Sequence, residues 1–429
     1  MRMTRCRTAI FILLVASGNA VADGPSDWPS WRGPKDNGST KLATYPVEFD
    51  KTTVRWRAPL PGKGCSTPIV LSQTVYLTAP VHGKDSLLAI DWSGDQKWCT
   101  TFGTETAGKH RNGSGCNASP VTDGNAVYVY FKSGTLAAVE TDGSIRWKTN
   151  LVQRFGKDER FWDHGTSPVL TGKYVVMARM HAGDSWLAAF DKTSGDMAWK
   201  VARNYSTPIE GDQCYTTPLV IQHDGQESLL VWGAQHVTIH KAVDGSVHWS
   251  CGNFNPDSKP LWPAIATPVI IGDMAIICHG RNDKQQPRLY GIRLTGSGDV
   301  TATNHVWQRK DVGSFVPTPV AYEGRVYLVR DRGEVECLDP QTGETIWSAA
   351  FPKGRAAFYA SPIIAGGILY APREDGVVFV GQVNDDQFKL LAQNHLDQPV
   401  IGSPVPALNC LFIRGQEHLF CLSRPAVEE

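Results

Sequence analysis

A Ser/Thr-Pro-apolar tripeptide recurs eight times along this chain, and this repeat restricts the possible fold more than any other feature. Successive copies lie 42 to 52 residues apart. Evenly spaced self-similarity of this length is typical of repeat architectures, in which each repeat forms one supersecondary unit. The copies are Thr67-Pro68-Ile69, Ser119-Pro120-Val121, Ser167-Pro168-Val169, Thr217-Pro218-Leu219, Thr267-Pro268-Val269, Thr318-Pro319-Val320, Ser361-Pro362-Ile363 and Ser403-Pro404-Val405.

The segments between the copies predict β-strands. Alternating apolar runs such as Ala126–Tyr130 and Arg325–Val329 are separated by turns such as Asp123-Gly124, and no long stretch has helical periodicity. Each unit has room for four antiparallel strands, here named A to D. A tandem array of such units predicts an all-β propeller. This architecture also explains how 429 residues fold, because a single core rarely grows beyond ~250–300 residues.

The two ends of the repeat array predict how the ring closes. The last unit, from Ser403 to Leu422, has room for only three strands, whereas an isolated strand from Thr53 to Arg57 precedes the first unit. We therefore expect the N-terminal strand to complete the last blade, which hides both sheet edges. The prediction is an eight-bladed β-propeller over residues 53–424, followed by a short C-terminal tail at 425–429.

A Trp recurs in the predicted fourth strand of most units, after a Gly turn. Large aromatic residues at a repeated position are packing devices, so we expect these side chains to dock each blade on the next. Unit seven has Leu390-Leu391 at this position instead. The predicted docking residues are Trp56, Trp98, Trp147, Trp199, Trp249, Trp307 and Trp347.

The N-terminus has the layout of a secretory signal peptide. Arg2, Arg5 and Arg7 precede an apolar run at 9–16, and Ala20-Val21-Ala22 supplies small residues for cleavage. A buried N-terminal helix is the alternative. We expect residues 1–22 to be removed after Ala22, which leaves an extended segment at 23–52 before the propeller. The apolar run is too short to span a bilayer, so the prediction is a periplasmic or extracellular protein without a transmembrane segment.

Charge and cysteine content narrow the partners. The 42 basic and 42 acidic residues balance, which argues against a nucleic-acid binder. The ten Cys are too few and too scattered for a disulfide framework. Cys410 and Cys421 flank a turn at 414–417, where a two-residue loop would place them directly opposite each other. A disulfide between them is one expectation, and two buried thiols are the other. We expect a monomer.

The stretch at 189–199, Ala-Phe-Asp-Lys-Thr-Ser-Gly-Asp-Met-Ala-Trp, resembles the tryptophan-docking motif of the pyrroloquinoline-quinone (PQQ) repeat superfamily. Related stretches occur at 89–98 and 337–347. That superfamily includes quinoprotein alcohol dehydrogenases and the non-enzymatic outer-membrane β-barrel assembly lipoprotein. The run Asp27-Trp-Pro-Ser-Trp-Arg-Gly-Pro34 looks like the N-terminal signature of secreted PQQ-like propellers. The resemblance implies the fold strongly and the function weakly, because one fold hosts many activities.

In such a blade the D–A and B–C loops lie on one face, and residues just before strand A crowd the channel mouth. His164 follows Asp163 directly, and this neighbouring imidazole and carboxylate could serve acid–base chemistry or ligand binding. The alternative is that His164 is structural and caps the entrance to strand A. The residues expected on this face are Trp162, Asp163, His164, Tyr215, Trp262 and Tyr359.

An Arg recurs at the predicted B–C turn of five units. Guanidinium groups in a ring would bind carboxylate or phosphate groups in bidentate fashion. The alternative is local pairing with nearby acids such as Asp283, Glu374 and Asp375. The predicted rim comprises Arg179, Arg281, Arg330 with Arg332, Arg373 and Arg414.

The sequence favours a non-catalytic binding or scaffold propeller whose loop face contacts a protein, a peptide or an anionic ligand. The alternative implied by the resemblance is an oxidoreductase that uses PQQ and Ca²⁺ on an alcohol or sugar. The chain lacks the vicinal Cys-Cys of those dehydrogenases and shows no recognised metal or nucleophile motif. We therefore predict no catalytic residues, no metal ligands and no assigned cofactor.

Overall fold

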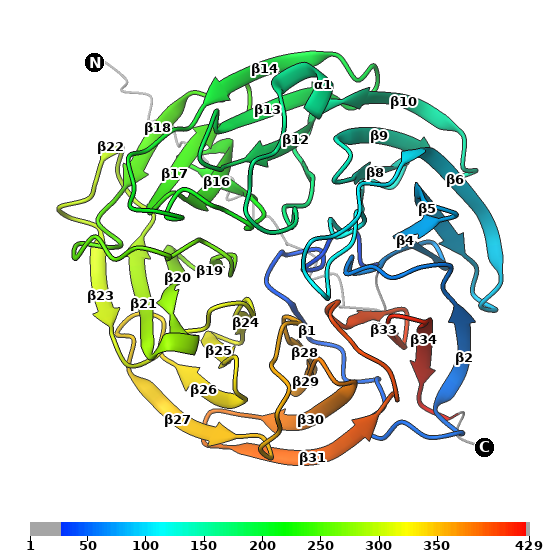
Figure 1. Cartoon of the computed structure of the whole chain (residues 1–429). Helices are drawn as coiled ribbons and strands as arrows, with labels where there is room; N and C mark the ends of the chain where they lie inside the picture. Colours follow the sequence, from blue (N-terminus) through cyan, green and yellow to red (C-terminus); the bar gives the residue numbers. More distant parts are fainter. Residues whose placement is uncertain (1–26, 426–429) are drawn as a thin grey trace, which may run out of the picture.

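The computed structural model describes residues 27–425, which form eight four-stranded antiparallel sheets around a central channel (Figure 1). The predicted eight-bladed propeller is confirmed. The first four blades are β3–β6 (Ile69–Leu71, Thr74–Val81, Lys84–Ile90, Gln96–Thr104), β7–β10 (Val121–Thr122, Ala126–Tyr130, Thr135–Glu140, Ile145–Asn150), β11–β14 (Val169–Leu170, Tyr174–Arg179, Trp186–Asp191, Met197–Ala202) and β15–β18 (Leu219–His223, Gln226–Gly233, His236–Lys241, Val247–Cys251).

The second half of the ring repeats this order, with two short additions. Strand β22 (Gly298–Asp299) extends blade four, and β1 (Ser39–Thr40) runs parallel to the inner strand of blade seven. Blades five to eight are β19, β20, β21 and β23 (Val269–Ile271, Met274–Arg281, Gln286–Arg293, His305–Arg309), β24–β27 (Val320–Tyr322, Arg325–Val329, Glu334–Leu338, Thr345–Ala350), β28–β31 (Ile363–Ala365, Ile368–Pro372, Val377–Val383, Phe388–His395) and β32–β34 with β2 (Val405–Ala407, Cys410–Arg414, His418–Ser423, Val54–Pro59).

Helical structure is confined to two short connections, α1 (Leu151–Phe155) and η1 (Asn282–Lys284). No helix within residues 27–425 is long and apolar enough to cross a membrane. The predicted signal peptide and the last four residues of the tail lie outside the described residues.

The ring closes between the two ends of the chain, as predicted. Strand β2 pairs antiparallel with β34, and Trp56 lies opposite Cys421. Leu60 N–H also donates to the carbonyl of Glu417. Because β2 is distant in sequence from the rest of its blade, this pairing joins both chain ends and covers the edge of β34 that would otherwise be unpaired.

The recurrent Trp residues dock consecutive blades. Each indole N–H donates to a backbone carbonyl in the next blade, over 2.9–3.1 Å. At five of the joints the ring also lies against a Gly of the next blade, where a Cβ atom would overlap it. The donors and acceptors are Trp56 to Trp92, Trp98 to Thr141, Trp147 to Lys192, Trp199 to Ala242, Trp249 to Thr295, Trp307 to Pro340 and Trp347 to Asn384.

The joint between blades seven and eight lacks this Trp and is filled by the N-terminal segment. Tyr45 is buried in the cluster that contains inner residues of both blades, with Val47 and Phe49 packed against it. Asn394 holds the segment by accepting from Phe49 N–H and donating to the Val47 carbonyl, at 2.8 and 2.9 Å. The segment therefore substitutes for the missing indole.

The Ser/Thr of the repeated tripeptide links neighbouring blades around the channel. Its backbone N–H donates to the corresponding hydroxyl of the next blade, at 2.9–3.1 Å. These bonds run from Thr67 around to Ser361 and from Ser403 back to Thr67. The remaining hydroxyl, that of Ser403, accepts instead from the indole of Trp31 at 3.2 Å. The first residue of each tripeptide thus contributes to a hydrogen-bonded ring around the channel. We call these eight Ser/Thr hydroxyls the hydroxyl ring.

The segment before β1 crosses the end of the channel opposite the D–A loops. Trp28 pairs with Val70 of blade one, and the Arg32 guanidinium donates to the carbonyls of Pro319 and Pro362 at 3.0 and 2.8 Å. Gly38 carries no Cβ, which would overlap the Arg32 side chain. The segment therefore ties blades one, six, seven and eight together from inside the ring.

The hairpin at Cys410 and Cys421 differs from the sequence expectation. The turn lies one residue later than expected, at 416–417, because Arg414 pairs with Leu419 and the Gly415 N–H donates to the His418 carbonyl, and this register places Cys421 opposite Phe412. The directly opposed placement was therefore wrong. Both cysteines are buried free thiols.

Candidate functional site

A well opens at the channel mouth on the face formed by the D–A and B–C loops. Its outer part is a cavity of about 520 Å³ and its inner part a cavity of about 210 Å³. The two parts share one lining residue from each of the eight blades, namely Cys65, Asn117, Asp163, Tyr215, Ile265, Val316, Tyr359 and Ile401. We call the two parts together the well.

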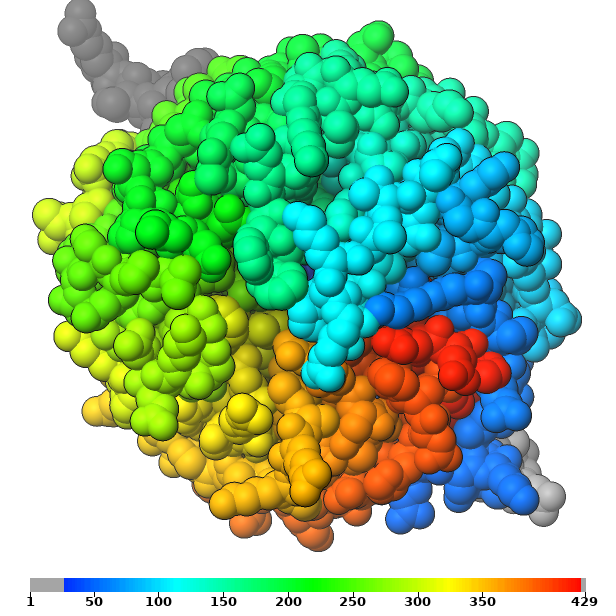
Figure 2. All heavy atoms as spheres, viewed as in Figure 1, coloured from blue at the N-terminus to red at the C-terminus, as the bar shows by residue number. Residues whose placement is uncertain are grey.

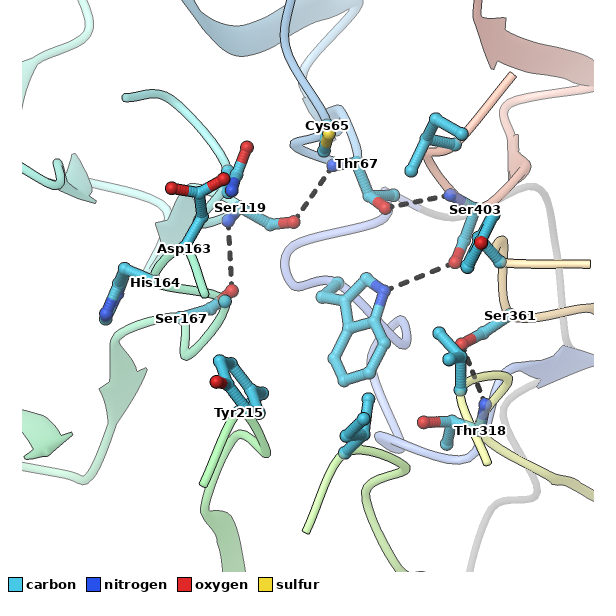
Figure 3. A pocket seen from close by; sticks show the side chains of 17 residues that line it. Cys65, Thr67, Ser119, Asp163, His164, Ser167, Tyr215, Thr318, Ser361 and Ser403 are labelled. Atoms are coloured by element: carbon cyan, nitrogen blue, oxygen red, sulfur yellow. Dashed lines mark hydrogen bonds between the residues drawn. The ribbon is translucent and has the colours of Figure 1, made fainter. Parts of the chain in front are cut away.

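Trp31 forms the floor of the well. It lines the inner cavity and also a separate cavity of about 170 Å³ that begins beyond the tripeptide prolines, at Pro120 and Pro168. Figure 3 shows Thr67, Ser119, Ser167, Thr318, Ser361 and Ser403 surrounding the inner cavity.

Two loops overhang the mouth. The loop between β6 and β7 reaches across the centre toward the last blades, as the cyan spheres in Figure 2 show. Arg111 forms a 2.6 Å ion pair with Glu374 of blade seven, and Asn112 donates to the same carboxylate at 2.8 Å. The second loop carries Trp162, whose ring lies edge-on to His110 with centroids 5.3 Å apart. The mouth is therefore narrowed from blades two and three.

The structure separates the neighbouring Asp163 and His164. Asp163 accepts from Lys132 Nζ at 2.6 Å and from the backbone N–H groups of Lys109 and His110. Burial opposes ionisation of Asp163, but these bonds hold the pKa of its carboxyl below the ordinary value. Asp163 thus anchors the overhanging loop.

His164 is structural in its contacts. Its Nδ1 meets the guanidinium of Arg160, which can only donate, so Nδ1 accepts and Nε2 carries the proton. Burial and the charge of Arg160 lower the pKa of His164 well below its ordinary value. Figure 3 shows its ring pointing away from the centre of the channel. The imidazole is therefore neutral and does not act with Asp163 as a pair.

Three members of the predicted Arg rim, Arg179, Arg373 and Arg414, are buried, and Arg179 and Arg414 bind backbone carbonyls. Arg179 donates to the carbonyls of Phe155 and Gly156, both at 2.6 Å, and holds the end of α1. Arg414 donates to the carbonyls of Ser66 and Thr78 across the closing seam, at 3.0 and 2.8 Å. Burial lowers the pKa of Arg414 to about 10, so its guanidinium stays charged. Neither group presents a cation to the surface.

Arg373 and two further members of the rim are engaged by local partners, which was the stated alternative. Arg281 and Arg373 form bidentate pairs with Asp283 and Asp375, at 2.7–2.9 Å. Arg330 donates to Glu336 and to Asn282.

Arg332 differs from the rest of the rim. It is exposed, lines the outer cavity, and has no ion-pair or hydrogen-bond partner within residues 27–425. The free positive charge of the predicted rim is thus concentrated at one position.

Some of the predicted aromatic residues lie at the well and one is buried. Trp162 is 47% exposed at the mouth, and its backbone N–H donates to the Tyr215 hydroxyl at 3.2 Å. Tyr359 lines both parts of the well. Trp262, by contrast, is buried and donates to Gln286, so it is not available on the surface.

Several residues of the site were missed by sequence reasoning. Phe161, next to Trp162, is 57% exposed, and Gln213 accepts from its N–H, which connects it to the loop that carries the 74% exposed Ile209. The adjacent aromatic pair Phe161-Trp162 was visible in the sequence as a signal. The floor residue Trp31 was not, because nothing local indicates that residues 28–36 enter the channel.

The acids of the well do not fit a Ca²⁺-bound quinone. Asp163 and Asp283 are paired with Lys132 and Arg281, and Asp331 accepts from Asn282 and from two backbone N–H groups. A Ca²⁺ ion needs six to eight oxygen ligands. Within the described range, no three His, Cys, Asp or Glu side chains converge as a metal site requires.

Comparison with known proteins gives the family. A family model described as outer membrane protein assembly factor BamB matches residues 45–250, 104–349 and 296–385, which together cover most of the chain. The chain belongs to this BamB family. The predicted relationship to PQQ-like propellers is confirmed.

Individual relatives of the BamB family are distant. The curated BamB of Yersinia pestis is 23% identical over 332 residues, which cover 76% of each chain. The solved BamB of Moraxella catarrhalis superposes with a TM-score of 0.61 at 15% identity, over 87% of this chain and 99% of that one. The quinohemoprotein alcohol dehydrogenase of Comamonas testosteroni gives 0.66 at 12% identity, over 95% and 82%. These two likenesses show the fold alone.

Proposed function

We propose that this protein is an exported, non-catalytic propeller scaffold that binds a polypeptide partner of outer-membrane protein assembly on its loop face. Membership of the BamB family supports a role in outer-membrane protein assembly. The signal-peptide layout of residues 1–22 supports export.

The observation that carries the proposal is the exposed aromatic pair beside the well. Phe161 and Trp162 are adjacent, about half exposed, and placed where the mouth narrows. Exposed aromatic residues at the rim of a cavity are typical of protein-binding hot spots. Most of the acids and rim arginines around them are already paired, which leaves apolar contact and, among the rim arginines, the cation of Arg332 for recognition.

A photo-crosslinking experiment tests this face directly. A photoreactive residue placed at Phe161 is expected to crosslink a component or client of outer-membrane assembly in cells, identified by mass spectrometry. The matched control is Val243, which is 68% exposed in the C–D turn of blade four on the opposite face. Equal crosslinking from Val243, or none from Phe161, contradicts the proposal.

The double variant Phe161→Ser/Trp162→Ser is expected to weaken binding of the identified partner at least tenfold. Truncating a hot-spot residue typically loses about 2 kcal/mol or more of binding free energy. Because both side chains are largely exposed, the melting temperature should change little, and calorimetry on the purified pair separates affinity from folding. Unchanged affinity would remove the aromatic pair from the interface.

A further inference from the structure

The hydroxyl ring contains O–H groups that have no hydrogen-bond acceptor within residues 27–425. Seven of its oxygens accept a backbone N–H and the eighth accepts the Trp31 indole N–H. A Ser or Thr hydroxyl also carries one proton to donate. Within residues 27–425, no acceptor takes a hydrogen bond from any of these eight hydroxyls. The fold uses one of the two acceptor positions on each oxygen and leaves the donor free.

Six of these hydroxyls converge on the inner cavity. Thr67, Ser119, Ser167, Thr318, Ser361 and Ser403 line it above Trp31 (Figure 3). A hydroxyl proton rotates about the C–O bond, so several donors can turn toward one group placed on the axis. The floor is therefore complementary to a hydrogen-bond acceptor.

Among the described residues, no unpaired acid lines the inner cavity to oppose such a group. Asp163 is the one carboxylate that lines the inner cavity, and Lys132 and two backbone N–H groups neutralise it. Preorganised neutral donors stabilise negative charge strongly where water is largely excluded. Charged acceptors also form shorter and stronger hydrogen bonds than neutral ones.

The wall above the ring includes an apolar part, beside Asn117, Tyr215 and Tyr359. Ile265, Val316 and Ile401 line both parts of the well, between the hydroxyls and the aromatic rim. The inner cavity of about 210 Å³ has the volume of several water molecules, each about 30 Å³, and so admits a carboxylate with a short chain. The inner cavity therefore offers hydroxyl donors together with apolar side chains.

We propose that the well binds an apolar carboxylate, with its carboxylate on the hydroxyl ring and its apolar body against the wall above. The group comes from a free organic acid or from the C-terminal carboxyl of a polypeptide. The second source rests on the proposed function. It specifies that the C-terminus of the polypeptide partner enters the well.

Calorimetric titration of the purified mature protein distinguishes the ligand chemistry. Hexanoate is expected to bind at least tenfold more tightly than hexanamide, which has the same body without the charge. A peptide ending in an apolar residue is compared with its C-terminally amidated form in the same way. If only the peptide binds more tightly than its amidated form, the carboxylate comes from a polypeptide. If only hexanoate binds more tightly than hexanamide, it comes from a free organic acid. Equal or absent binding in both pairs shows that the ring does not recognise a carboxylate and overturns the proposal.

Two threonines provide a matched pair of variants. Thr318 and Thr267 each accept a backbone N–H of the preceding blade, at 3.0 and 3.1 Å, but only Thr318 lines the inner cavity. Thr318→Val is expected to weaken the carboxylate about tenfold, whereas Thr267→Val retains affinity. If both variants lose affinity equally, ring integrity and not donation controls binding.

These results separate the two proposals. Failure of both carboxylate pairs with intact crosslinking at Phe161 leaves the scaffold function and removes the ligand. Binding of hexanoate without crosslinking at Phe161 removes the scaffold function and keeps the ligand site.

Discussion

A chain that begins at Asp50 is expected to lose on the order of 5 kcal/mol of unfolding free energy relative to one that begins at Asp27. The truncation removes Trp28 and Tyr45, both almost fully buried. Burial of one such side chain contributes about 1.5–3 kcal/mol. It also removes the Arg32 bonds to blades six and seven and the Trp31 bond to Ser403. Chemical denaturation of the two purified chains measures the difference.

The start at Asp27 is the control because it retains every described residue of the segment. If the shorter chain does not fold, Arg32→Met provides a second measurement. That variant removes a buried guanidinium and leaves the carbonyls of Pro319 and Pro362 without their donor, so a loss of about 2 kcal/mol is expected. Unchanged stability in either chain shows that the segment covers the ring without holding it.

The variant Asp85→Asn is expected to stabilise the protein by on the order of 2 kcal/mol at pH 8 and to have little effect at pH 4. Asp85 is fully buried at the start of β5, and neither carboxyl oxygen has a hydrogen-bond partner. Burial, with a contribution from the charge of Glu105, raises the pKa of Asp85 to about 7. The folded chain therefore keeps this proton up to about pH 7, whereas the unfolded chain loses it near pH 4.

Stability of the unmodified protein accordingly falls as pH rises from about 4 to 7, and the Asn variant removes that slope. Asp163→Asn is the matched opposite. The pKa of Asp163 is lowered, so its contribution is present at neutral pH and is lost as the pH falls toward the lowered value. This variant should lose about 3 kcal/mol at pH 7, because Lys132 is left without its carboxylate. Melting curves at several pH values measure both, and equal pH profiles would contradict the assignment.

The repeat made most of the fold predictable. Tripeptides at regular spacing and Trp residues after Gly turns are local signals, and each repeat reports the same blade. The closing pair Trp56 and Cys421 was predictable because an incomplete last blade requires a strand from elsewhere. The register of the hairpin at Cys410 was not, since the turn lies one residue further along the chain than expected and its position depends on local turn geometry.

The site was less predictable than the fold. Recurrent arginines share an offset in the sequence, yet Arg179 and Arg414 turn inward while Arg332 remains free. Such differences depend on which carbonyls and carboxylates lie within reach, and these come from neighbouring blades. Asp163 and His164 are adjacent in sequence, but Asp163 pairs with Lys132 whereas His164 contacts Arg160.

Sequence alone determined the number of blades, the seam and the docking residues, because these follow from periodic patterns that repeat along the chain. Only the tertiary structure decided that residues 28–36 cross the channel, that Trp31 forms a floor, and that eight hydroxyls meet around an axis. The physical reason is that each blade contributes only one or a few residues to the channel, so the residues that meet there are about one blade apart in sequence. Their convergence, their hydrogen-bond partners and their remaining donors exist only when the ring is closed.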